Sequence, residues 1–379
     1  MKIIGNAFQG SFSSKKHYRR RSVALVFASL VFLLMSVIGA THVRRGLPSQ
    51  ATALYVMGDS SVDCGENTLG YPFLRRNFSL SPCDNGSDTT LLPHFLAKKM
   101  NLPKIPSFYN QNGSIEGLKQ GLNYGSAIAT IIKVGSLSHQ SLNQQLRQVF
   151  ETIQLLQLHL GEEESQHFVK SSIFYLSFGK YDYVNLFLGN SSGLMLGFSG
   201  QEFANILVNQ IVRAIKNLYN ADVRKMIVMG IMPLGCMPHV VWEWTKTESE
   251  NDGEARGCVE EINVLALQYN TMLHERILDL NTELPDAHIT FCDVYHGTLE
   301  IMSNAARYGF KDVKNPCCGL HTQDAIVGCL SIEMACNQSS GHVWWDSYNP
   351  TEAVNSLLAN SAWSGYICSP ISVQDMVYT

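Results

Sequence analysis

The segment Leu54-Tyr55-Val56-Met57-Gly58-Asp59-Ser60-Ser61 decides the fold of this chain, because it predicts a short buried strand that runs directly into a turn. Leu54 to Met57 are apolar, β-branched or aromatic, as in central strands that are covered on both faces. Loops at the carboxyl ends of parallel strands build the sites of α/β proteins. Ser60 therefore stands where a nucleophile would be expected, and a serine N-cap is the structural alternative.

Three later segments repeat the strand pattern, and three amphipathic stretches accompany them. The predicted strands are Ile173 to Phe178, Met226 to Met229 and Ile289 to Val294. The stretches 142–160, 203–218 and 259–280 carry apolar residues at spacings of three and four, which predicts helices with one buried face. This alternation indicates the α/β class, with βα units around a parallel sheet.

Composition indicates one large domain over residues 46–379. The chain has 379 residues and 45% hydrophobic content, and no composition break divides its body. Eight of the 28 Lys and Arg lie in residues 1–45, which contain no Asp or Glu, so 20 basic and 32 acidic residues remain. A body with a net charge of −12 disfavours nucleic acid as a partner.

Residues 1–45 are typical of a targeting segment. Six basic residues precede the uncharged run 22–41, whose 20 residues match the roughly 20 that span a bilayer and exceed the roughly 7 to 15 of a signal-peptide core. Gly39 and Ala40 offer small residues for cleavage. A signal peptide and a signal anchor both remain open, and an uncleaved 22–41 span would tether a lumenal body to the membrane.

Cysteines and sequons agree with the secretory pathway, and with a secreted, extracellular or membrane-anchored protein. All ten cysteines follow the apolar run, and an oxidising lumen favours their pairing, with connectivity open. The sequence lacks the repeated CxxC pairs that are typical of zinc sites, so disulfides are favoured over a metal. Asn-x-Ser sequons predict N-glycosylation at Asn77, Asn85, Asn112, Asn190 and Asn337.

Five sequence blocks in order resemble the plant-type GDSL esterase/lipase family of SGNH hydrolases. The resemblance covers about Leu54 to Ser364. Its blocks are Gly58-Asp59-Ser60-Ser61, Asn123-Tyr124-Gly125-Ser126-Ala127, Ser177-Phe178-Gly179-Lys180-Tyr181-Asp182-Tyr183, Gly230-Ile231-Met232-Pro233-Leu234-Gly235-Cys236-Met237-Pro238 and Trp345-Asp346 to Glu352.

This resemblance implies a three-layer α/β/α, flavodoxin-like fold with a short parallel sheet, and a serine esterase without cofactor or metal. Ser60 and Asp346 match the family's catalytic serine and aspartate, but Asn349 stands where the family has histidine. The oxyanion donors would be the N–H groups of Ser60 and Ala127, with Tyr181 in place of the family's asparagine.

These two changes predict weak or absent turnover. Loss of the base in a serine triad costs on the order of 10⁶ in kcat, whereas loss of one oxyanion donor costs about 10² to 10³. The sequence therefore predicts a carboxylic-ester hydrolase scaffold of the lipid-degrading type with impaired or lost catalysis. Such a pseudoenzyme would still have a pocket for a small acyl-ester or lipid-like ligand.

Two alternatives remain open. An active hydrolase would pair Ser60 with a relocated base, for which His239 is the best-placed histidine; His342 is nearer Asp346 in sequence but lies at the far end of an extended stretch. A structural membrane-anchored protein would need no pocket chemistry. Asn349 would then be only a turn residue before Pro350. Substrate and oligomeric state are not indicated.

Overall fold

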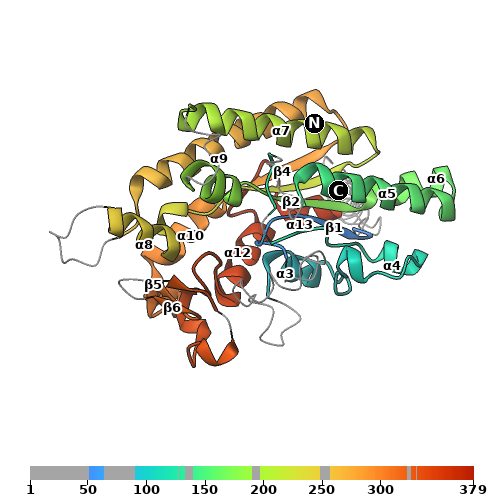
Figure 1. Ribbon diagram of the computed structural model, residues 1–379. Helices are drawn as coiled ribbons and strands as arrows, with labels where there is room; N and C mark the ends of the chain where they lie inside the picture. Colours follow the sequence, from blue (N-terminus) through green and yellow to red (C-terminus); the bar gives the residue numbers. More distant parts are fainter. Residues whose placement is uncertain are drawn as a thin grey trace, which may run out of the picture. The chain divides into compact units, whose positions relative to one another are not determined.

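The computed structural model describes residues 51–63, 90–127, 129–132, 140–189, 197–247, 257–321, 326–329 and 331–379 (Figure 1). Ser49–Thr379 forms one compact unit. The predictions for the 22–41 span, Asn77, Asn85 and Asn190 lie outside the described residues, whereas Asn112 and Asn337 are exposed. Within the described ranges, no helix is both long and apolar enough to cross a bilayer.

A mostly parallel sheet forms the centre of this unit. Its described strands are β1 (Leu54–Gly58), β2 (Ile173–Ser177), β3 (Lys225–Met229), β4 (His288–Cys292) and β9 (Cys368–Ser369), hydrogen bonded in that order. The first four are parallel, and β9 is antiparallel to β4. Every residue of β1, β2 and β3 is buried, as expected for strands covered on both faces.

Helices cover both faces of the sheet, which gives the predicted three layers. Figure 1 shows α5 (Leu142–Leu160), α7 (Gly200–Asn220) and α9 (Glu260–Glu283) on one side, and α3 (Leu92–Lys99) and α12 (Glu352–Ser364) on the other. The other described helices are α4 (Ile115–Lys119), α6 (Glu162–Ser171), α8 (Pro238–Thr247), α10 (Val294–Ser303), α11 (Ala305–Tyr308) and α13 (Val373–Tyr378).

The boundaries of the elements differ modestly from the predictions. The fourth strand ends at Cys292 instead of Val294, because the Asp293 side chain accepts a hydrogen bond from the His296 N–H and caps α10. The second strand ends at Ser177 instead of Phe178. An unpredicted segment around Asn123 pairs with the outer edge of β1, through the bond from the Val56 N–H to the Leu122 carbonyl (2.8 Å).

Disulfides occur as predicted for eight of the cysteines. The described pairs are Cys236–Cys258, Cys292–Cys368, Cys317–Cys336 and Cys318–Cys329. Cys64 and Cys83 lie outside the described residues. The last two pairs hold a region with the short strands β5 (Asp312–Pro316), β6 (Leu320–His321), β7 (Ile326–Val327) and β8 (His342–Trp344). This region leads directly into the segment that contains Asp346.

Candidate active site

The turn after β1 presents Ser60. Gly58 has no room for a side chain, because a Cβ there would overlap the Ser177 carbonyl of the neighbouring strand. The Asp59 N–H donates to that same carbonyl (3.1 Å), and the Asp59 carboxylate accepts the Ser61 N–H (2.9 Å). Asp59 thus has the structural role of closing the turn. Ser60 is 8% exposed.

A second loop lies against this turn. The Ser126 N–H donates to the Gly58 carbonyl (3.0 Å), and the Asn123 side-chain amide donates to the Val62 carbonyl (2.6 Å). These bonds bring the loop that contains Ala127 to the end of β1. The oxyanion roles of the Ser60 and Ala127 N–H groups remain predictions.

Asp346 and Asn349 meet Ser60 from the loop before α12. The Asp346 carboxylate accepts the N–H groups of Tyr348 (2.8 Å) and Asn349 (2.7 Å), as well as the Asn349 side-chain amide (3.0 Å to Oδ2). The Asn349 Oδ1 in turn accepts the Ser60 hydroxyl (2.9 Å). Asn349 therefore bridges Asp346 and Ser60, but a carboxamide has no basic nitrogen to take a proton.

Lys180, which the sequence analysis did not select, completes this cluster. Its Nζ lies 2.6 Å from the Ser60 Oγ and 2.9 Å from the Asn349 Oδ1. The Asp59 carboxylate is 3.9 Å away. Lys180 is only 7% exposed. Burial lowers the pKa of Lys180, while Asp59 and Asp346 act in the opposite direction.

The backbone explains why Lys180 points inward. Gly179, the second residue after β2, has a φ of +117°, a conformation that residues with a side chain rarely adopt. The chain turns there, and the Asp182–Leu188 helical turn begins two residues after Lys180. A buried strand followed by Gly-Lys was the available sequence signal. The family's motif assigns no function to the position that Lys180 occupies, so the resemblance does not indicate this residue.

Tyr181 also contacts Ser60. Its side chain is 8% exposed and hydrogen bonds with the Ser60 side chain. Burial raises the pKa of Tyr181 well above its ordinary value, so its hydroxyl stays protonated and is able to donate. The Lys180 Nζ lies 5.2 Å from the centre of the Tyr181 ring.

Asp182 anchors a neighbouring loop instead of reaching Ser60. Its carboxylate accepts the N–H groups of Ile131 (2.9 Å) and Ile132 (3.1 Å). Burial, together with the nearby Asp59, raises the pKa of Asp182 to about 7, and these N–H groups oppose the shift. The residue that follows Tyr181 thus fixes the loop that continues from Ala127.

A narrow and mostly apolar cavity opens beside Ser60 at the carboxyl ends of the strands. Its volume is about 50 Å³. One water needs roughly 10 to 15 Å³, so the space fits only a few heavy atoms. Apolar residues from α3, from the loop after β3 and from α10 and α12 form its walls: Leu91, Leu92, Ile231, Met232, Val294 and Leu358.

The histidines considered as relocated bases have other partners. The His239 Nε2 lies 3.3 Å from the Glu243 carboxylate, and its ring packs on Tyr348 with centroids 4.6 Å apart. His342 lies on β8 with its Nδ1 at 3.3 Å from the Asn315 carbonyl. In the described ranges, the Ser60 hydroxyl bonds to Lys180, Asn349 and Tyr181.

Cysteine and acidic side chains give no candidate metal centre. No group of three or more His, Cys, Asp or Glu side chains among the described residues is arranged to hold an ion. The acidic residues of the Ser60 cluster are instead occupied by backbone N–H groups, by Asn349 and by Lys180.

Comparisons with known proteins cover the part of the chain that contains this site. The GDSL-like lipase/acylhydrolase model matches residues 54–362. Two GDSL esterase/lipases of Arabidopsis thaliana are 29% and 30% identical over 86% of this chain, covering 89% and 85% of their own lengths. An extracellular lipase of Streptomyces rimosus aligns over 66% of this chain and 82% of its own, with 12% identity and a TM-score of 0.29. This TM-score is too low to support the family assignment. This chain belongs to the GDSL-like lipase/acylhydrolase family.

Proposed function

We propose that this protein hydrolyses carboxylic esters with short acyl groups, that Ser60 is the nucleophile, and that turnover is slower than in a Ser-His-Asp hydrolase. The observation that carries the proposal is the position of Ser60, a residue that is 8% exposed, on the wall of a narrow and mostly apolar cavity. Such a cavity favours an acyl chain of a few carbons.

The expected slowness follows from Asn349. Its Nδ2 donates to Asp346 and its Oδ1 accepts from Ser60 and Lys180, so the residue at the histidine position is unable to remove the serine proton. Tyr181 supplies a phenolic donor where an amide would act in the family pattern, which changes the position of one oxyanion contact.

A secreted or extracellular location fits this proposal. The disulfides of the described region are typical of proteins that fold in an oxidising compartment. The N-terminal segment 1–45 and the sequons remain sequence predictions that agree with it.

A second candidate function is ligand binding without turnover. The closed hydrogen-bond network around Asn349 favours it, because a stable network that holds the serine as a donor stabilises the resting state. In this case the cavity would take an acyl ester or a lipid-like molecule and release it unchanged.

Ester turnover by the purified full-length chain separates these candidates. We expect hydrolysis of p-nitrophenyl acetate to exceed that of the octanoate, and Ser60→Ala to lower kcat by at least about 10³. Ser61→Ala is the matched control, because the Ser61 hydroxyl bonds to Ser177 (2.7 Å). Equal rates for Ser60→Ala and the native chain would contradict the proposal. Binding of an ester analogue without any turnover would favour the second candidate.

A further inference from the structure

We propose that Lys180 is the general base of this site and takes the Ser60 proton in place of the absent histidine. This inference rests on the proposed function and names a catalytic residue for it. It also gives Asn349 a new role, that of a positioning residue for the lysine amine.

The geometry is that of a compact triangle. The Lys180 Nζ is 2.6 Å from the Ser60 Oγ and 2.9 Å from the Asn349 Oδ1, and the Ser60 Oγ is 2.9 Å from the same Oδ1. Proton transfer needs heavy atoms about 2.6 to 3.2 Å apart. The amine satisfies this distance directly, without an intervening water. In the resting structure the amine donates to the Ser60 Oγ and the Ser60 hydroxyl donates to the Asn349 Oδ1, so the transfer requires the hydroxyl to turn from that oxygen toward the free electron pair of the amine.

Of the three side chains that contact Ser60, the amine alone has a suitable nitrogen. The Asn349 amide is not basic, and the Tyr181 phenol is held in its protonated form by burial. A neutral lysine amine has a free electron pair that is able to accept the serine proton. Serine–lysine pairs serve this purpose on unrelated folds.

The surroundings of Lys180 favour the neutral form of its amine more than bulk water would. Lys180 is 7% exposed, and burial lowers its pKa. The charged groups that face it are Asp59 from the end of β1 and Asp346 from the loop before α12, and both oppose this shift. Burial also raises the pKa of Asp59, which weakens the counter-charge beside the amine. Buried lysines are well suited to general-base chemistry for this reason.

The Asn349 side chain positions the lysine amine, although it is not itself a base. Its Oδ1 accepts an N–H of the amine and so holds the Lys180 Nζ beside Ser60. The Asp346 carboxylate prevents rotation of the amide by accepting a hydrogen bond from the Asn349 Nδ2 (3.0 Å). The order Asp346, Asn349, Lys180, Ser60 thus replaces the order aspartate, histidine, serine.

The reaction balances with water as the second substrate. The Ser60 Oγ bonds to the ester carbonyl carbon while its proton passes to the Lys180 Nζ, and the carbonyl electron pair moves to oxygen. Collapse breaks the bond to the alkoxy group, which leaves as an alcohol with the proton from the ammonium. A water then attacks the acyl-serine and gives its proton to the amine. The acid departs as the Ser60 Oγ takes that proton back.

Substitution of Lys180 in the full-length chain tests the inference. We expect Lys180→Met and Lys180→Arg to lower kcat by about 10² to 10⁴, with KM changed less than threefold. Lys170→Met is the matched control, since this lysine pairs with Asp222 on the surface (3.3 Å). In Lys180→Ala, added propylamine should raise kcat at least tenfold above that of the variant without amine. A more basic amine should raise kcat further.

The pH dependence and the alternative outcomes are equally specific. The kcat of the native chain should rise with pH and reach a plateau with a midpoint below 10.5, the ordinary lysine pKa. This rise should vanish in Lys180→Met. Thermal unfolding of each variant checks that it is folded. Ser60-dependent turnover that survives in Lys180→Met would overturn the inference and leave the proposed function intact. Absence of turnover in the native chain would overturn both.

Discussion

The Ser60 hydroxyl is surrounded by one amine, one amide and one phenol. The sequence blocks placed Ser60, Asp346 and Asn349 in one predicted site, and the structure brings these side chains into contact, while their catalytic roles stay predictions. The blocks were insufficient for Lys180. A lysine side chain is long, and its direction depends on the turn at Gly179, whose φ of +117° is not encoded in any spacing.

Exchange of the base is the sharpest prediction for single residues. In Asn349→His alone, the new imidazole would compete with the Lys180 amine for the space beside Ser60, so we expect no gain in kcat/KM. In the double variant Lys180→Ser, Asn349→His, the imidazole is held by Asp346 and faces the serine. We expect kcat/KM at least about tenfold above Lys180→Ser alone, with half-maximal activity near pH 6.5, the ordinary histidine pKa. A pH profile identical to that of the native chain would contradict this account.

Substitution of Tyr181 tests the oxyanion role that is predicted for its hydroxyl. Tyr181→Phe removes a hydroxyl that bonds to Ser60 and keeps the ring, so we expect kcat to fall by about 10² with little change in KM. Tyr183→Phe is the control, because the buried Tyr183 hydroxyl has no hydrogen-bond partner in the described region. Steady-state kinetics on p-nitrophenyl acetate measure both. Loss of activity in both variants alike would show that the effect is not specific to the site.

Among the elements, long periodic helices and central strands were predictable, whereas very short segments were not. α5 spans 142–160 as predicted, because its apolar spacing extends over five turns. β9 has two residues and the edge segment at Asn123 pairs through single bridges, so neither has a detectable period. The predicted fourth strand extends two residues beyond the end of β4, because Val294, the first residue of α10, is apolar as well.

Asp182 links two elements and makes stability depend on pH. Its pKa rises from 3.8 to about 7 on folding, so the folded state holds the proton more tightly than the unfolded chain does. Its contribution is therefore most favourable below pH 3.8 and is lost as the pH rises through about 7. We expect the free energy of unfolding of the native chain to decrease over this window, by up to a few kcal/mol. Asp182→Asn should flatten the decrease in urea titrations, and parallel curves would contradict the assignment.

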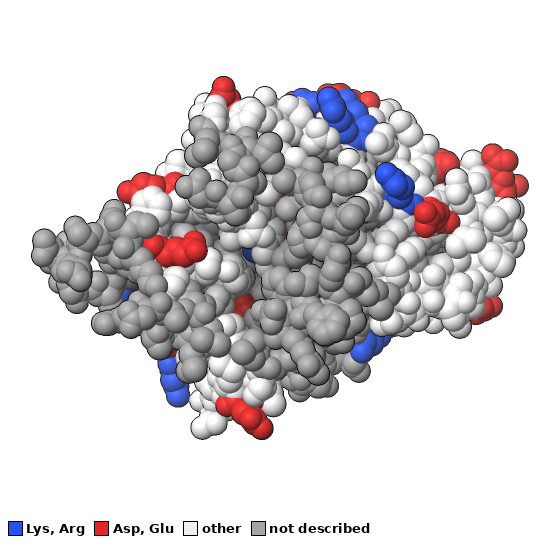
Figure 2. Space-filling model, in the orientation of Figure 1, with Lys and Arg blue, Asp and Glu red and all other residues white. Residues whose placement is uncertain are grey.

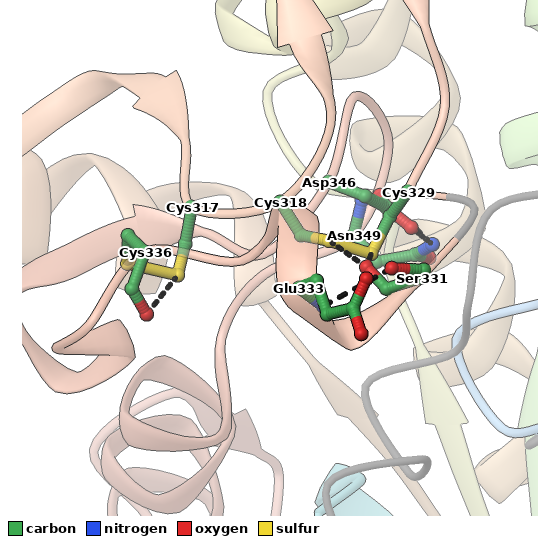
Figure 3. Close-up of a disulfide and its surroundings, with 8 residues drawn as sticks. All are labelled: Cys317, Cys318, Cys329, Ser331, Glu333, Cys336, Asp346 and Asn349. Carbon is green, nitrogen blue, oxygen red and sulfur yellow. Dashed lines mark hydrogen bonds between the residues drawn. A yellow bond between two sulfur atoms is a disulfide. The ribbon is translucent and has the colours of Figure 1, made fainter.

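Two disulfides should affect stability and activity differently. The Cys318 N–H donates to the Trp345 carbonyl (2.7 Å), directly before Asp346, and Figure 3 shows the Cys318–Cys329 disulfide together with Asp346 and Asn349. Cys292–Cys368 instead joins β4 to β9, with a sequence separation of 76 against 11. Paired serine substitutions should cost roughly 3 kcal/mol at Cys318–Cys329 and roughly 4.5 kcal/mol at Cys292–Cys368.

Activity should rank these disulfide variants in the opposite order. We expect the Cys318 and Cys329 double variant to lose more kcat/KM, because the loop that holds Asp346 is released. Chemical denaturation and ester turnover are measured on the same samples. A larger activity loss in the Cys292 and Cys368 double variant would contradict a positioning role for the 312–345 region.

For the whole molecule, the sheet explains why distant segments meet. Parallel strands end on one edge, so the loops after β1, β2, β3 and β4 all reach the cavity beside Ser60. Acidic and basic side chains are scattered over the face in Figure 2, and its described part has no continuous basic patch. The expectation from net charge that nucleic acid is not a partner stays a prediction. Class and layering follow from hydrophobic patterning, but the contact between Lys180 and Ser60 requires the assembled sheet.

Labelling of the full-length chain with a fluorophosphonate, followed by peptide mass spectrometry, tests the central claim most directly. The reagent needs an activated serine. We predict a single phosphonylated residue, Ser60, with a labelling rate that rises with pH and falls at least about 10² in Lys180→Met. Equal labelling of Ser60 in the native chain and in Lys180→Met would contradict the claim that the lysine amine activates this serine.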